Sequence, residues 1–277
     1  MEINGKTELY GVIGNPVKHS LSPVFQNVGF KSLGINAVYL PLEVSKERFE
    51  ESVRGLLSLE NLKGFNVTVP FKEGILKFGD LLSEDVKHIG SANTLKKTPE
   101  GRIEFYNTDW VGFLNALKEL TDPAGKKVLV LGAGGTSRAV IYALKRVNAE
   151  VFLWNRTLSK AEKLAQSFGV KIIKNLNNIG VFEIIVNTTS VGLKEDDPPL
   201  FDYKKIQAHQ VVYDVIYRQT PLVETALKKG AKAQNGLKML LYQGVESFKI
   251  WTGKEPPIGT MWRALKRAFT ENHARKS

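Results

Sequence analysis

The chain has 277 residues, and 43% of them are hydrophobic, which is enough apolar material for a folded core and argues against global disorder. It contains no cysteine, which excludes a disulfide framework, a thiolate zinc site and a cysteine nucleophile, and its four histidines are too dispersed to predict a metal site. A net charge of +11 suits nucleic-acid binding, attraction of an anionic substrate and cofactor, or a lysine-rich solvated surface.

The sequence predicts a cytoplasmic protein. It has no apolar run long enough to cross a bilayer, and its first residues lack the charged and apolar regions of a signal peptide. The abundance of lysine and glutamate without cysteine would also suit a heat-adapted protein.

The first part of the chain alternates strands with helices. Strands are predicted over 9–14, 38–42 and 64–69, and a helix over 71–82 with a break near Gly79. Ser22 reads as an N-cap before Pro23, and Ser45 as the cap of a second helix. The segment 92–95 is too short to decide between strand and loop, whereas 105–109 ends one partner of a hairpin.

A helix over 111–120 leads into a second region. Strands over 128–131, 150–154, 170–173, 184–188, 211–215 and 231–233 alternate there with helices over 137–147, 161–168 and 221–227. Such alternation predicts a parallel, doubly wound sheet. A helix over 237–251 and a last one capped by Thr260 should pack back on the first region. We therefore expect an α/β protein of two domains, one formed by residues 1–110 plus 238–277 and a Rossmann-like one formed by 111–237.

A glycine-rich turn follows the apolar strand 128–131. In the segment 132–136, Gly132 permits a tight turn and Gly134 lets a phosphate approach the backbone, while Ser137 is the third small residue of the dinucleotide-binding pattern. The N–H groups and dipole of the next helix would face the phosphates. The pattern is common, and an ordinary strand–turn–helix gives it too.

The residues after the next strand favour NADP over NAD. Folds that bind NAD usually place Asp or Glu there to bind the ribose 2′-hydroxyl. This chain has Asn155, Arg156 and Thr157, with Lys160 one turn further on. A carboxylate would repel a 2′-phosphate, whereas Arg156 can clamp one through charge-assisted hydrogen bonds, unless it is a solvated surface arginine.

Two charged side chains are candidates for proton chemistry. Alternation puts Asn66 and Thr68 on one face of a strand that Pro70 ends, and Lys72 follows. Lys72 would donate a proton if burial or neighbouring charges tune it, and Asp109 would hold that lysine charged and oriented. The alternatives are an exposed lysine and a helix cap.

Three further polar residues have both a functional and a structural explanation. Capping alone explains Ser22, while a hydroxyl pair that faces a carboxylate would explain both Ser20 and Ser22. Asn93 is either a ligand-binding residue or a turn residue.

Taken together, these motifs resemble the shikimate dehydrogenase family almost from end to end. The matching segments are Ser20-Leu21-Ser22-Pro23, Asn66-Val67-Thr68-Val69-Pro70-Phe71-Lys72, Ala92-Asn93-Thr94, Asn107-Thr108-Asp109, Gly132-Ala133-Gly134-Gly135, Asn155-Arg156-Thr157, Asn187-Thr188-Thr189 and Tyr242-Gln243. The resemblance implies NADP-linked reduction of 3-dehydroshikimate to shikimate within aromatic amino-acid biosynthesis. Thr136 departs from the alanine that is common in the family, and either crowds the turn slightly or adds a hydroxyl to the phosphate site.

The resemblance also assigns roles to residues. Lys72 and Asp109 form the catalytic pair, and it stays open which of them is the formal proton donor. The substrate carboxylate is assigned to Ser20 and Ser22 with Tyr217 nearby, and the ring hydroxyls to Thr68, Lys72, Asn93, Asp109 and Gln243. The NADP pyrophosphate is assigned to Gly132, Ala133, Gly134, Gly135 and Thr136, the adenosine phosphate to Asn155, Arg156, Thr157 and Lys160, and the rest of the cofactor to Thr188, Ser190, Val215, Gly236, Glu84 and Met239.

Two other functions compete with this one. A relative acting on quinate, or on both acids, would show much the same motifs. A non-catalytic basic protein that binds nucleic acid should show aromatic side chains clustered among its lysines, and none stand out. The expected partner is therefore a small-molecule substrate, with neither nucleic acid nor membrane, for a monomer or homodimer.

Overall fold

The computed structural model describes residues 2–194 and 196–274, and the chain divides into two compact units. Unit 1 comprises Met1–Thr108 and Gln243–Ser277, and unit 2 comprises Asp109–Tyr242. The sequence places the corresponding boundaries after residues 110 and 237. Helix α8 (Leu237–Thr252) starts in unit 2 and ends in unit 1. The roles predicted for the two units, substrate binding for one and cofactor binding for the other, stay predictions.

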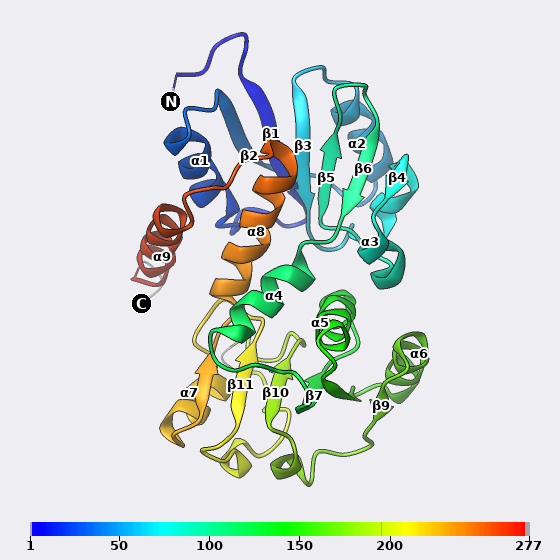
Figure 1. Ribbon diagram of the computed structural model, residues 1–277, viewed down its shortest axis with the longest axis vertical. Helices are drawn as coiled ribbons and strands as arrows, with labels where there is room; N and C mark the ends of the chain where they lie inside the picture. The colour runs from blue at the N-terminus through cyan, green and yellow to red at the C-terminus, as the bar shows by residue number, and fades with distance from the viewer. Residues whose placement is uncertain (1, 195, 275–277) are drawn as a thin grey trace. The chain divides into compact units, whose positions relative to one another are not determined.

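Unit 1 is built on a six-stranded mixed sheet with the strand order β2-β1-β3-β5-β6-β4 (Figure 1). Its strands are β1 (Glu8–Gly14), β2 (Ala37–Glu43), β3 (Leu62–Val67), β4 (Leu81–Leu82), β5 (Thr94–Lys97) and β6 (Ile103–Tyr106). Its helices are α1 (Ser22–Ser32), α2 (Phe49–Leu57), α3 (Glu84–Ile89) and α9 (Ile258–Ala274), with a 3-10 turn over Gly74–Phe78. β1 runs parallel to β2 and β3, whereas β5 is antiparallel to β3 and β6. The short segment at 92–95 thus contributes a strand, and the predicted hairpin is confirmed.

The C-terminal helices pack on unit 1, as the sequence predicts. Helix α9 contacts α1. Further along α8, the ring of Phe248 lies 4.9 Å from that of Phe30 in α1. Trp251 donates a 2.8 Å hydrogen bond from its indole N–H to the carbonyl of Leu95 in β5. The C-terminal part of α8 is therefore held against both the sheet and the first helix.

Unit 2 is a doubly wound sheet with six strands in the order β12-β11-β10-β7-β8-β9, and all of its strand pairs are parallel. The strands are β7 (Lys127–Leu131), β8 (Glu150–Trp154), β9 (Lys171–Ile172), β10 (Ile184–Asn187), β11 (Val211–Asp214) and β12 (Lys232–Gln234). The helices are α4 (Asp109–Lys118), α5 (Gly135–Arg146), α6 (Leu158–Phe168) and α7 (Pro221–Lys228), with 3-10 turns over Ile179–Val181 and Tyr203–Lys205. This is the Rossmann strand order: β8 and β9 are added on one side of β7, and β10 to β12 on the other, so the strand order reverses between the neighbouring β7 and β10.

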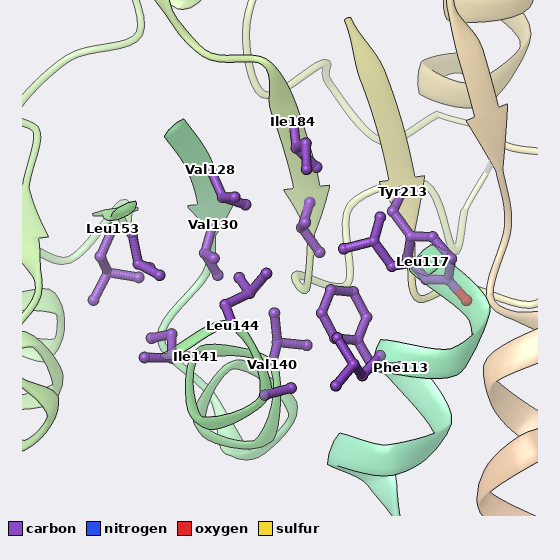
Figure 2. Packing of buried hydrophobic residues seen from close by; sticks show 14 of the residues in the cluster. Phe113, Leu117, Val128, Val130, Val140, Ile141, Leu144, Leu153, Ile184 and Tyr213 are labelled. Carbon is purple, nitrogen blue, oxygen red and sulfur yellow. The ribbon is translucent and has the colours of Figure 1, made fainter. Parts of the chain in front are cut away.

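The core of unit 2 explains why β7 is apolar at successive positions. Val128 and Val130 face the helices α4 and α5, where Phe113 and Leu144 are fully buried (Figure 2). Leu129 and its neighbour at 131 belong to a second apolar cluster with residues of α7. Because helices cover both faces of the sheet, a central parallel strand needs apolar side chains on both sides.

The predicted helix over 71–82 is wrong. Only the 3-10 turn over 74–78 forms, and the chain then pairs as β4 with β6. A Cβ at Gly79 would lie 2.5 Å from a ring carbon of Phe105, so the backbone packs directly on that ring. Asp80 next exchanges bonds with Ile103, whose N–H donates to the Asp80 carboxylate at 2.7 Å. These tertiary bonds override the apolar spacing that suggested a helix.

Three predicted helix starts also shift. The residue before α1 is Leu21, so Ser22 is helical, and its N–H donates to the Ser20 hydroxyl at 3.3 Å. Helix α2 begins at Phe49, and the Ser45 hydroxyl instead accepts from the N–H of Arg48 in the preceding turn. Helix α9 begins two residues before Thr260.

Candidate active site

Buried amides and hydroxyls gather in unit 1 at the ends of its strands. We call the following six residues, buried at 8% exposure or less, the amide–hydroxyl cluster: Asn66, Asn93, Thr94, Thr108, Gln243 and Ser247. They come from β3, from β5 and the residue before it, from the segment after β6, and from α8. Asn93 donates from its amide to the Gln243 side-chain oxygen at 3.2 Å. The structure thus brings together two predicted substrate-binding residues 150 positions apart.

The two serines lie at the start of α1, next to this cluster. Ser22 is buried, and its hydroxyl contacts that of Tyr39 in β2. Tyr39 in turn donates a 2.7 Å hydrogen bond to the side-chain oxygen of Asn66. Burial raises the pKa of the Tyr39 phenol well above its usual value, although the Ser22 hydroxyl lowers it. Ser22 is therefore connected through Tyr39 to the amide–hydroxyl cluster, while Ser20 is half-buried beside it.

The loop after β3 carries the next two predicted residues. The strand ends at Val67, so Thr68 lies in the loop and not on a strand face shared with Asn66. The Thr68 N–H donates to the carbonyl of Ile13 in β1 at 2.9 Å. Lys72 is half-buried, and its carbonyl accepts a 2.9 Å bond from the N–H of the residue before Asn93. That bond holds the Lys72 backbone near Asn93.

Asp109 starts helix α4 and is 7% exposed. It is the first helical residue and directly follows Thr108, a member of the amide–hydroxyl cluster. Burial raises the pKa of the Tyr217 hydroxyl, and the negative charge of Asp109 raises it further. Tyr217 as a whole residue is 46% exposed.

The glycine turn of unit 2 lies at the carboxyl ends of β7 and β10. Gly132 has a positive φ of 110°, and a Cβ there would lie 2.7 Å from the Thr188 hydroxyl oxygen, so protein packing requires glycine. At Gly134 and Gly135, by contrast, a Cβ would meet no atom within 4 Å. The backbone at the start of α5 thus leaves room for a ligand, with Ala133 and Thr136 half-buried alongside.

Hydroxyl groups fasten this turn to the neighbouring strand. The Ser137 hydroxyl accepts from the N–H of Gly134 at 3.0 Å and lies 2.7 Å from the Thr188 hydroxyl oxygen. Thr188 also donates to the carbonyl of Leu131 at 2.7 Å. Ser137 thus links Gly134 and Thr188, two of the predicted cofactor residues, at the switch point of the sheet, where ligands of this fold bind. Ser190 is exposed two residues further on.

The segments at 215–217 and 236–239 approach each other closely. A Cβ at Gly236 would lie 2.1 Å from the Val215 carbonyl oxygen, and the Gly236 N–H donates to the carbonyl of Ile216 at 2.9 Å. Val215 is half-buried, and Met239 is buried in the apolar core below. The structure thus brings together Val215, Tyr217 and Gly236.

The candidate phosphate clamp lies at the start of α6. Thr157 precedes the helix, Arg156 and Lys160 are exposed, and the Asn155 amide donates to the Thr157 carbonyl at 2.8 Å. No carboxylate forms an ion pair with Arg156 or Lys160 within residues 2–194 and 196–274. Both cations therefore stay available for an anionic ligand.

Glu84 is the predicted cofactor residue that belongs to unit 1. It is exposed at the start of α3 in unit 1, where it pairs with Lys87 at 2.5 Å, whereas the other predicted cofactor residues lie in unit 2. Among the described residues, no group of acidic and histidine side chains has the spacing of a metal site. Within the same residues, no helix is long and apolar enough to cross a membrane.

Sequence reasoning missed a second buried cluster. Asp214 at the end of β11 is fully buried, and it accepts hydrogen bonds from the Asn187 amide at 3.1 Å and the Thr220 hydroxyl at 2.8 Å. The Asn187 oxygen accepts in turn from the Thr189 N–H at 3.0 Å. We call Asp214, Asn187, Thr189 and Thr220 the carboxylate cluster. It holds the loops that carry Thr188, Ser190, Val215 and Tyr217. In the sequence, the signal for this cluster is Asp214, an acidic residue at the end of an apolar strand.

Three family models match the chain. Residues 12–95 match the shikimate dehydrogenase substrate binding domain, residues 115–192 match shikimate / quinate 5-dehydrogenase, and residues 236–266 match the shikimate 5'-dehydrogenase C-terminal domain. Shikimate dehydrogenase (NADP(+)) of Aquifex aeolicus is 51% identical over 266 residues, which cover 95% of this chain and 98% of the relative. The chain belongs to the shikimate dehydrogenase family.

Solved structures of the family agree with the fold. The crystal structure of shikimate dehydrogenase from Aquifex aeolicus has a TM-score of 0.93 at 51% identity, covering 95% of this chain and 99% of that one. Shikimate 5-dehydrogenase from Thermus thermophilus, in complex with NADP(H) and shikimate, has a TM-score of 0.88 at 36% identity, covering 94% and 99%. The predicted α/β class and the resemblance stated from the motifs are therefore confirmed.

Proposed function

We propose that this protein catalyses the NADP-dependent, reversible reduction of 3-dehydroshikimate to shikimate. The observation that carries the proposal is the 51% identity, over 95% of the chain, to a relative named shikimate dehydrogenase (NADP(+)). The shared name favours shikimate over quinate, and an oxidoreductase over a nucleic-acid-binding protein. A cytoplasmic location and a monomeric or homodimeric state stay predictions.

The residues of unit 2 fit an NADP cofactor. The open backbone at Gly134 and Gly135 accepts a pyrophosphate at the start of α5, and the unpaired Arg156 and Lys160 suit a 2′-phosphate. Gly132 and Thr136 complete the phosphate site with Ala133, while Thr188, Ser190, Val215, Gly236 and Met239 line the path of the nicotinamide. When bound, NADPH supplies the hydride. Glu84, which pairs with Lys87 in unit 1, stays a predicted cofactor residue.

The residues of unit 1 orient the substrate and supply its proton. Ser20 and Ser22 bind the carboxylate with Tyr217, and Thr68, Asn93 and Gln243 bind the ring oxygens. Reduction of the ketone generates an alkoxide, which must receive a proton. Lys72 and Asp109 form the pair that delivers it, since an ammonium stabilises the developing negative charge and a carboxylate keeps that ammonium oriented.

The direct test is oxidation of shikimate by the purified protein, followed at the nicotinamide absorbance band. NADP⁺ with shikimate should give a rate well above those of NAD⁺ with shikimate and of NADP⁺ with quinate. A protein with no shikimate activity under either cofactor would contradict the proposed function. A higher kcat/KM with quinate than with shikimate would assign quinate as the substrate instead.

The catalytic pair is tested by Lys72→Ala, with Lys87→Ala of the exposed α3 surface as a control. Removing the ammonium should lower kcat about 10²- to 10⁴-fold, the usual contribution of general acid–base catalysis, and should change the KM for shikimate far less. Steady-state kinetics give both constants. An unchanged kcat would show that Lys72 takes no part in proton transfer.

The phosphate clamp is tested by Arg156→Ala with both cofactors. Loss of charge-assisted hydrogen bonds to a 2′-phosphate should weaken NADP⁺ binding about 10- to 100-fold. NAD⁺ has no such phosphate and serves as the internal control, with a nearly unchanged dissociation constant by titration calorimetry. Equal losses for both cofactors would remove Arg156 from the selectivity argument.

A further inference from the structure

A chain of hydrogen bonds with a fixed direction runs from the glycine turn of unit 2 to the end of β7. The Gly134 N–H donates to the Ser137 hydroxyl at 3.0 Å, and that hydroxyl lies 2.7 Å from the Thr188 hydroxyl. Thr188 donates in turn to the Leu131 carbonyl at 2.7 Å. A carbonyl can only accept, so the single hydroxyl proton of Thr188 points toward Leu131. Ser137 must therefore donate to Thr188 and accept from Gly134.

This direction decides which donors of the turn remain for a ligand. The Gly134 N–H is bound within the protein, so Gly134 offers a phosphate room but no donor. Gly134 is also the N-cap of α5, and no side chain of the described residues caps the helix there. The N–H groups of Gly135 and Thr136 lie in the first turn, where an α-helix provides no acceptor for them. They are therefore the donors that a pyrophosphate at the start of α5 would meet.

The same bonds join the start of α5 to the neighbouring strand. Ser137 is fully buried, and Thr188 directly follows the last residue of β10. A Cβ at Gly132 would lie 2.7 Å from the Thr188 hydroxyl oxygen, so this hydroxyl packs directly on the beginning of the turn. Through Thr188, the Ser137 hydroxyl thus fixes the first turn of α5 relative to both β7 and β10.

We propose that Ser137 is a positioning residue for the cofactor, which holds the start of α5 so that the N–H groups of Gly135 and Thr136 donate to the pyrophosphate. The role rests on the proposed function, in which the NADP pyrophosphate binds at this turn. Helix–strand packing requires only a small residue at position 137, where the dinucleotide-binding pattern has glycine or alanine. The hydroxyl of Ser137 is therefore an addition that serves the turn and not the packing.

The glycine turn and α5 keep other anchors when the Ser137 hydroxyl is removed. The Gly132 N–H donates to the carbonyl of Trp154, the last residue of β8, at 2.8 Å. Val140 and Leu144 of α5 are fully buried in the apolar core of unit 2. Ser137→Ala should therefore fold, with a looser first turn of α5.

The experiment compares Ser137→Ala with Ser167→Ala. Ser167 is an exposed serine of α6 in the same unit, and its hydroxyl donates to the Lys163 carbonyl at 3.0 Å. In titration calorimetry, Ser137→Ala should raise the dissociation constant of NADP⁺ about 10-fold, the equivalent of one lost hydrogen bond. Adenosine 2′-phosphate has no pyrophosphate, so its dissociation constant should stay within about twofold. Ser167→Ala should change neither constant.

A second readout needs no cofactor. In ¹⁵N-labelled wild type, the Gly134 amide proton should exchange with solvent more slowly than that of Gly135, because only the first is bound within the protein. Ser137→Ala should remove this difference. Ser137→Cys keeps most of the volume with a weaker donor and acceptor, so it should fall between the two, and it serves as the test if the alanine variant does not fold.

The outcomes separate the two proposals. A wild type that does not bind NADP⁺ contradicts the proposed function. If the wild type binds NADP⁺ and Ser137→Ala binds it within about twofold of the wild type, the positioning role is overturned, because Ser137 would then be structural only. Equal losses for NADP⁺ and adenosine 2′-phosphate would overturn it too, because the effect would not be specific to the pyrophosphate.

Discussion

The two units each bury a polar cluster at the ends of their strands, but the clusters differ in charge. In unit 1 the amide–hydroxyl cluster is neutral, and the backbone N–H of Thr108 sets the orientation of its Asn93 amide. In unit 2 the carboxylate cluster is centred on Asp214, which accepts from an amide, a hydroxyl and the N–H of Ile216. Burial raises the pKa of Asp214, although these donors lower it. The side chains around a site can thus be oriented either by a hydrogen-bonded network of neutral groups or by one buried carboxylate whose charge depends on pH.

Asp214→Ala should have the largest effect of the substitutions that probe this difference. It leaves three buried donors without their acceptor, each at a cost of about 1–3 kcal/mol. We expect the free energy of unfolding in urea to fall by about 3 kcal/mol or more. The loops that carry Thr188 and Val215 should loosen, so NADP⁺ affinity should fall as well. Asp202→Ala is the control, because that exposed carboxylate only caps a 3-10 turn. A loss below about 1 kcal/mol would mean that the carboxylate is not the centre of its cluster.

Asn93→Asp tests whether the cluster of unit 1 depends on being neutral. One oxygen of the new carboxylate still accepts from Thr108, but the other faces the oxygen of Gln243 and cannot donate to it. We expect a loss of about 2–4 kcal/mol in the free energy of unfolding at neutral pH, with a higher KM for shikimate. The loss should shrink as the pH falls, because burial raises the pKa of such a carboxyl. A loss independent of pH would show that charge is not its cause.

Asp214→Asn should have the smallest effect and tests the pH sensitivity directly. Since the folded-state pKa of Asp214 lies above its unfolded value, protonation stabilises the folded wild type at low pH, and this contribution is lost as the pH rises through the folded pKa. The wild type should therefore gain stability relative to the variant as the pH falls from neutral toward about 4, the pKa of an aspartate in the unfolded chain. Urea unfolding of both proteins at each pH measures the difference. If the free energies of unfolding of both proteins changed with pH in the same way, the raised pKa of Asp214 would be contradicted.

The sequence predicted the features that depend on local patterns. The apolar run 128–131 predicted a strand covered on both faces, and the position of Arg156 after the next strand favoured NADP over NAD. Both follow from residues within one short segment. The helix predicted over 71–82 failed because Gly79 packs on Phe105, which lies outside that segment.

The buried clusters depend on long-range pairing, and a local pattern does not contain it. Ser247 and Asn66 are separated by 181 positions, and a serine on the buried side of an amphipathic helix looks like any small core residue. Asp214 gave one local signal, a carboxylate at the end of an apolar strand, but its partner Thr220 reads equally well as the cap of α7. Only the folded structure shows that these groups are hydrogen-bond partners.

The glycines around the cofactor site differ in whether folding alone requires them. Gly132 and Gly236 leave no room for a side chain, so selection for folding alone preserves them whatever the protein binds. Gly134 and Gly135 face open space, so folding alone tolerates a larger residue there. In a mutational scan that reports abundance and activity separately, the first two positions should be depleted in both, and the last two in activity alone. A lineage that lost its cofactor would therefore change first at Gly134 and Gly135.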